Sequence, residues 1–124
     1  MIFYVDDDLM MFNVFEKVFK KSKHDVFFNK DGEGVVEKLL AMNPRPDIIL
    51  LDMVMPKLSG LEILSMIKNK PELESIPVIC FSNLAEPENI KKAKSLGAVR
   101  YLIKSDYDPF QVLSVIEEVI KKSK

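Results

Sequence analysis

Acidic side chains follow two short apolar runs of this chain. Asp6, Asp7 and Asp8 come directly after one run, and Asp52 comes directly after another. If the two runs are neighbouring parallel strands, their carboxyl ends place these acids at one edge of the sheet. Carboxylates so close together repel one another, and a cation with few protein oxygens, such as Mg²⁺, relieves the repulsion. A carboxylate neutralised by a metal can attack phosphorus, so the pattern indicates phosphoryl chemistry.

A hydroxyl group and a lysine follow two later apolar runs. Ser82 ends the fourth run and Lys104 ends the fifth. A lysine supplies positive charge to phosphate oxygens, and a hydroxyl donates a hydrogen bond to one of them. Each residue alone has an ordinary alternative, as a helix-capping acid, a turn aspartate, a loop hydroxyl or a surface lysine. Their co-occurrence after four different runs favours a shared site.

The apolar runs alternate with amphipathic stretches along the whole chain. The expected strands are Ile2–Val5, Val26–Asn29, Asp47–Leu51, Val78–Phe81 and Val99–Ile103. The expected helices are Asp8–Lys21, Gly34–Met42, Ser59–Lys68, Pro87–Leu96 and Asp108–Lys122. This alternation predicts an α/β fold, a doubly wound (βα)₅ chain with a five-stranded parallel sheet. The flavodoxin-like layout of such a sheet has the strand order 2-1-3-4-5.

Two local patterns mark helix ends. Ser59 followed by Glu62 is a capping-box pattern at the start of a helix, and Gly97 suits the end of one.

Length and composition restrict the class of protein. The 124 residues fit one domain spanning 1–124, and the net charge of −1 gives no general attraction to nucleic acid or anionic membranes. The single cysteine, Cys80, excludes an internal disulfide and suits a reducing compartment. No apolar run approaches the roughly 20 residues that span a bilayer. We therefore expect a cytoplasmic protein.

Four segments of the chain resemble the receiver family of two-component response regulators, and among its members the stand-alone chemotaxis-type receivers. In chain order they are Val5-Asp6-Asp7, Leu51-Asp52-Met53-Val54-Met55-Pro56 with Gly60, Phe81-Ser82-Asn83, and Tyr101-Leu102-Ile103-Lys104. The resemblance covers essentially the whole chain in order and spacing, and the segment from Asp52 to Gly60 is its most specific part.

The resemblance implies a role for each matching residue. Asp52 would accept a phosphoryl group, and Lys104 and Ser82 would contact that group. The implied ligands of Mg²⁺ are Asp6, Asp7, Asp52 and the backbone carbonyl of Val54. Tyr101 would move inward as Ser82 moves, and this would change the face formed by the fourth helix, the fifth strand and the fifth helix.

The resemblance implies a phosphorylation switch rather than an enzyme acting on other substrates. The phosphodonor would be a histidine kinase or a phosphotransfer protein, because the only histidine, His24, lies in a polar turn. Output would pass to a downstream protein or through a homodimer, without direct contact to nucleic acid or membrane. Two alternatives stay open: a receiver-like interaction module that is never phosphorylated, and a Mg²⁺-dependent phosphohydrolase with an aspartyl nucleophile. The second lacks room for a cap domain.

Two residues depart from the family's pattern. Ser105 stands where a proline usually follows the lysine, so we expect a trans peptide bond and a loop that holds Lys104 differently. Asn83 stands where a small residue is common. Its side chain would narrow access to Asp52, or hydrogen-bond a phosphoryl group or a water.

Overall fold

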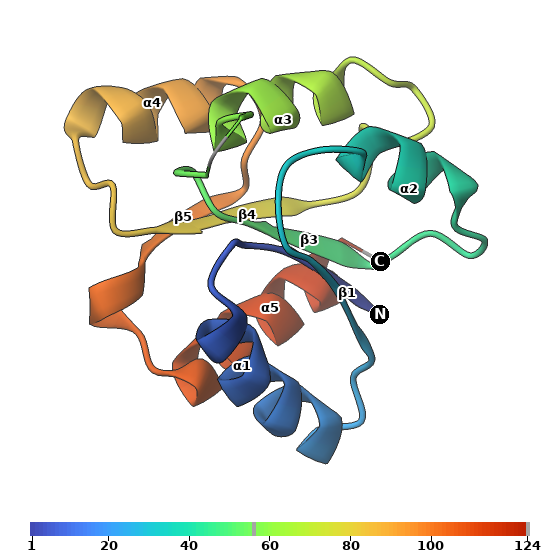
Figure 1. Ribbon diagram of the computed structural model, residues 1–124, viewed down its shortest axis with the longest axis vertical. Helices are drawn as coiled ribbons and strands as arrows, with labels where there is room; N and C mark the ends of the chain where they lie inside the picture. The colour runs from blue at the N-terminus through green and yellow to red at the C-terminus, as the bar shows by residue number, and fades with distance from the viewer. Residues whose placement is uncertain (56, 124) are drawn as a thin grey trace.

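A parallel sheet lies between two layers of helices (Figure 1). The computed structural model describes residues 1–55 and 57–123, and within them a five-stranded sheet of order β2-β1-β3-β4-β5. The strands are β1 (Ile2–Val5), β2 (Val26–Asn29), β3 (Ile48–Leu51), β4 (Val78–Ser82) and β5 (Arg100–Ile103). The predicted fold class and strand order are confirmed. Pro56 of the expected motif lies outside the described residues.

The helices divide between the two faces of the sheet. In Figure 1, α1 (Leu9–Lys21) and α5 (Pro109–Lys122) lie on one face. The other face carries α2 (Val35–Ala41), α3 (Gly60–Lys68) and α4 (Pro87–Ser95). A short 3₁₀ turn, η1 (Lys104–Asp106), connects β5 to α5. Within the described part of the chain, every helix is too short or too polar to cross a lipid bilayer.

The central strands are apolar on both sides because each side faces a helical layer. In β1, Phe3 and Val5 pack into the core under α2, α3 and α4. Ile2 and Tyr4 pack into the core under α1 and α5. All four side chains are fully buried. The alternation follows from the two-residue period of a strand, and it leaves the strand ends free to present polar groups.

The helix ends differ from the predicted ranges mainly by their cap residues. Asp8, Ser59 and Asp108 are N-caps just outside the helices that they precede. The capping box of Ser59 and Glu62 is confirmed. Gly97 has φ +113° just after α4, a left-handed conformation that glycine adopts without strain, so the expected terminating glycine is confirmed.

Candidate functional site

The carboxyl ends of β1 and β3 bring three aspartates together. The strands pair with Val5 opposite Leu51, so the residues that follow them are neighbours, and the Asp52 amide donates to the Val5 carbonyl at 2.9 Å. One carboxylate oxygen each of Asp6, Asp7 and Asp52 lies within 4.8 Å of the others. Asp6 and Asp52 are buried, whereas Asp7 is exposed. Three oxygens at this spacing suit a divalent metal ion, which the donor set of hard carboxylates also favours.

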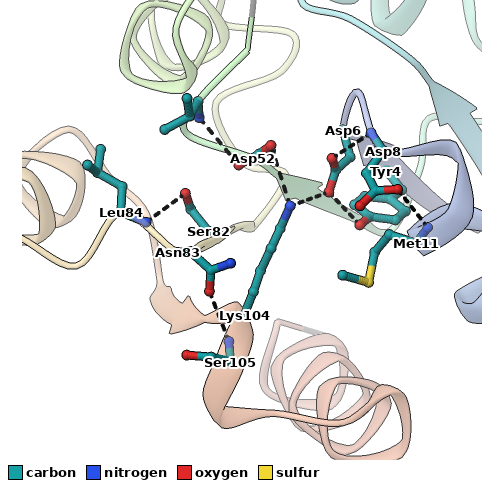
Figure 2. A network of polar contacts seen from close by, with 11 residues as sticks. Tyr4, Asp6, Asp8, Met11, Asp52, Ser82, Asn83, Leu84, Lys104 and Ser105 are labelled. Carbon is teal, nitrogen blue, oxygen red and sulfur yellow. Dashed lines mark hydrogen bonds and ion pairs between the residues drawn. The ribbon is translucent and has the colours of Figure 1, made fainter.

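Lys104 reaches into this group from the end of β5 (Figure 2). Its Nζ lies 2.8 Å from Asp6 Oδ2 and 3.5 Å from Asp52 Oδ2. Lys104 therefore contacts both carboxylates, and Asp6 is the closer partner. Burial alone would lower the pKa of Lys104, yet its hydrogen bond to Asp6 and the charges of both acids raise that pKa above its ordinary value. Lys104 is thus held in its charged form.

The positive charge of Lys104 only partly offsets the burial of the Asp52 carboxylate. Burial is the largest influence and raises the pKa of the Asp52 carboxyl, and the charge of Asp6 raises it further. Lys104 and the Val54 amide, which donates to Asp52 Oδ1 at 3.3 Å, act in the opposite direction without cancelling that rise. A divalent cation beside the three acids would supply the missing charge.

Asp6 is oriented by hydrogen bonds on both of its oxygens. The buried Tyr4 hydroxyl donates to Asp6 Oδ2 at 2.6 Å, and the Asp8 amide donates to Oδ1 at 3.0 Å. The sequence motifs did not single out Tyr4. The available signal was a tyrosine inside an apolar strand, since a buried hydroxyl needs a partner. Asp8 itself caps α1 by accepting from the Met11 amide at 3.1 Å.

Ser82 and Tyr101 are both bound to the backbone of Leu84. Ser82 lies at the end of β4, is 1% exposed, and its Oγ accepts a hydrogen bond from the Leu84 amide at 3.2 Å. The Tyr101 hydroxyl donates to the Leu84 carbonyl. Burial is the main cause that raises the pKa of Tyr101 to about 12. Ser82 and Tyr101, which are expected to move together, therefore share Leu84 as a hydrogen-bond partner.

Asn83 and Ser105 join two loops. Asn83 Oδ1 accepts a hydrogen bond from the Ser105 amide at 3.0 Å, as Figure 2 shows. The Asn83 side chain is thus engaged with the loop after β5. The Lys104–Ser105 peptide bond is trans, as expected. The sequence flagged each residue separately but gave no sign of their contact.

Comparison with known proteins defines the class. Residues 2–117 match the family model described as the response regulator receiver domain. Together with the acidic pocket and Lys104, this match shows that the chain belongs to the receiver family of two-component signalling. The family consists of phosphoacceptor domains rather than conventional enzymes, which removes the support for a phosphohydrolase.

One curated relative is similar to this chain over nearly its whole length. The chain is 36% identical over 128 residues to a protein-glutamate methylesterase/protein-glutamine glutaminase of Syntrophomonas wolfei; the match covers 99% of this chain and 35% of the relative. The chain thus spans about a third of that protein.

Two solved response regulators bear on the site. The phosphorylated cyanobacterial phytochrome response regulator RcpA is 30% identical, with a TM-score of 0.82 and coverage of 95% of this chain and 89% of RcpA. The Mn²⁺-bound form of Rcp1, a protein of Synechocystis, is 28% identical, with a TM-score of 0.77 and coverage of 98% and 87%. The acidic cluster of this chain is typical of a divalent-metal site in receivers.

Proposed function

We propose that Asp52 accepts a phosphoryl group in a Mg²⁺-dependent reaction and that the modified chain controls a protein partner. The observation that carries this proposal is the arrangement of Asp6, Asp7 and Asp52 with their oxygens within 4.8 Å and Lys104 3.5 Å from Asp52. The geometry supports the roles that the resemblance implies for these residues. We treat residues 1–124 as one receiver domain.

The three aspartates fit a small divalent cation. Mg²⁺ takes few protein oxygens and keeps several waters, which suits a site with one exposed and two buried carboxylates. We assign Asp6, Asp7, Asp52 and the Val54 carbonyl as its protein ligands. When bound, the cation supplies positive charge to the oxygens of the incoming phosphoryl group.

The transfer step needs a nucleophile and a positive group beside it. An Asp52 carboxylate oxygen attacks phosphorus, and the bond from phosphorus to the donor's imidazole nitrogen breaks, so the electron pair leaves with the imidazole. The product is an aspartyl phosphate. Lys104 attracts the transferred oxygens because its ammonium is already charged and close. The donor is another molecule, since the sole histidine, His24, pairs with Glu117 on α5 at 3.0 Å.

The new phosphoryl group would reorganise the loop that carries Ser82. Phosphorylation adds about −1.5 to −2 charges and three strong acceptors. The Ser82 hydroxyl leaves the Leu84 amide to donate to a phosphoryl oxygen. Tyr101 follows because its hydroxyl is bound to the same Leu84 backbone. The outcome is an altered face of α4, β5 and α5.

The partners follow from this chemistry. We assign a histidine kinase or a phosphotransfer protein as donor and a protein as target, with a homodimer as one form that output can take. A net charge of −1 supports a protein target rather than nucleic acid or membrane. The single cysteine supports a cytoplasmic location.

The test is phosphorylation by acetyl phosphate with Mg²⁺, read by intact mass. Wild type should gain one phosphate and Asp52→Asn none. Asp25→Asn, which changes an exposed aspartate before β2, is the matched control and should behave as wild type. Chelation of the metal should abolish the gain. A wild-type chain that gains no phosphate would instead favour the interaction module that is never phosphorylated.

A further inference from the structure

The segment that carries Lys104 is a short and shallow turn. Turn η1 has three residues, Lys104–Asp106, and none of these described residues is buried. The Lys104 side chain is nevertheless only 12% exposed and reaches Asp6 at 2.8 Å. An ammonium group that must meet two carboxylates within 3.5 Å needs a fixed backbone behind it. Packing of the turn itself cannot provide that.

A hydrogen bond from the neighbouring strand end supplies a fixed point. Ser82 pairs with Ile103 in the sheet, so Asn83 and Lys104 are the next residues on adjacent strands. Asn83 Oδ1 accepts from the Ser105 amide at 3.0 Å, one residue beyond the lysine. Figure 2 shows this contact beside the base of the extended Lys104 side chain. The Asn83 residue is exposed, so this bond rather than core packing holds its side chain.

The chemistry of position 105 makes this contact available. A proline has no amide hydrogen, so a chain with proline at 105 could not donate to Asn83. Conversely, an alanine at 83 would offer no acceptor to the Ser105 amide. The two positions therefore work only as a pair.

We propose that Asn83 is a positioning residue that holds Lys104 toward Asp6 and Asp52 through the Ser105 amide. This inference rests on the proposed function, since it assigns Asn83 to the phosphorylation of Asp52. Among the described residues, the hydrogen bond of the Asn83 side chain goes to the Ser105 amide and not to Asp52 or the proposed metal ligands. It acts by fixing the backbone from which the Lys104 side chain extends.

The experiment compares Asn83→Ala, Ser105→Pro and the double variant with wild type. Asn13→Ala, an exposed asparagine of α1, is the matched control. Four quantities are measured: the phosphorylation rate at saturating acetyl phosphate, the apparent KM, the Mg²⁺ dissociation constant and the urea midpoint. Exchange of the Ser105 amide and the Lys104 Nζ resonance are followed by NMR in the metal-free proteins.

Asn83→Ala should lower the maximal rate roughly three- to tenfold, the range that one lost hydrogen bond gives. The Mg²⁺ affinity should stay unchanged, which a general loss of structure would not allow. Exchange of the Ser105 amide should accelerate and the Lys104 resonance should shift. The double variant should be no slower than the slower single variant, because both substitutions remove one interaction.

Three results would overturn the proposal. One is an Asn83→Ala rate equal to that of wild type. Another is multiplication of the two losses in the double variant, which would show that Asn83 and Ser105 act independently of each other. The third is a Ser105 amide and a Lys104 resonance unaffected by Asn83→Ala. If wild type takes no phosphate, the proposed function fails. The NMR measurements in the metal-free proteins still test whether Asn83 positions Lys104, because they need no phosphorylation.

Discussion

Helices α4 and α5 lie on opposite faces of the sheet and are attached to it very differently (Figure 1). Helix α5 buries four side chains: Val112, Leu113, Ile116 and Val119. Of the residues of α4, all of them described, only Ala93 is buried. Because buried apolar area is the main source of attachment energy, α5 is held to the core more firmly than α4.

The helix starts show the same contrast. Asp108 and Gln111 form a capping box at the start of α5. At the start of α4, Glu86 makes no side-chain cap hydrogen bond in the described structure. Tyr101 and Leu84, which pack against the core cluster that includes Ala93 of α4, are only partly buried. A weakly held helix next to the loop after Ser82 can take a second arrangement at low energy, so we expect the proposed switch to move α4 rather than α5.

The test of this contrast with the largest expected effect replaces one isoleucine in each helix with alanine. Ile116→Ala in α5 should lower the free energy of unfolding by about 2–5 kcal/mol, since it leaves a cavity in a fully buried position. Ile90→Ala in α4 should cost at most about 1 kcal/mol, because this side chain is half-buried. Urea unfolding measures both. Equal losses would show that α4 is as firmly attached as α5.

The helices and strands could be predicted from the sequence because their buried residues recur at the spacing typical of each. The alternation of apolar runs with amphipathic stretches predicted β1 and β3. The position of Asp6, Asp52, Ser82 and Lys104 directly after four of these runs predicted that they lie at one edge of the sheet. The few apolar positions of α4, with lysines between them, agree with its single buried residue. The strand positions and their shared edge follow from the course of the backbone in a parallel sheet, without knowledge of side-chain contacts.

Other features of the site depend on where side-chain atoms end. Lys104 lies closer to Asp6 than to Asp52 by less than one ångström, which no sequence pattern encodes. The contact of Asn83 with Ser105 joins residues 22 apart in the chain. Tyr4 could have been suspected as a buried hydroxyl, but its partner could not. Such choices are fixed by packing after the fold has formed.

A second, smaller test uses the helix starts. Asp108→Ala removes the cap of α5, whose carboxylate accepts from the Gln111 amide at 2.8 Å, and should cost about 1 kcal/mol. Glu86→Ala at the start of α4 should change the stability by only a few tenths of that, because it removes an exposed hydrogen bond from the Asn89 side chain but no backbone cap bond. Thermal unfolding and amide exchange of the first turns would record the difference. A larger loss at Glu86 would contradict it.

The smallest expected effect concerns Asp52, which lies between the two layers at the sheet edge. Burial, reinforced by Asp6, raises the pKa of Asp52, while Lys104 opposes that rise. Between the unfolded and folded pKa values the native chain binds more protons than the unfolded chain. Stability therefore falls as pH rises through this window, and the ionised Asp52 destabilises the native state above it.

Asp52→Asn should accordingly stabilise the metal-free protein at neutral pH. The gain should fade as pH falls through the folded pKa of Asp52 toward the ordinary carboxyl value, about 3.9. Lys104 does not reverse the sign, because its raised pKa contributes stability that is lost only at alkaline pH, and Asp6 remains its partner. Urea titrations from about pH 4 to 8, with Asp25→Asn as control, measure the effect. A neutral-pH loss of stability in Asp52→Asn would mean that the attraction of Lys104 outweighs burial, and the pocket would then need no metal to balance its charge.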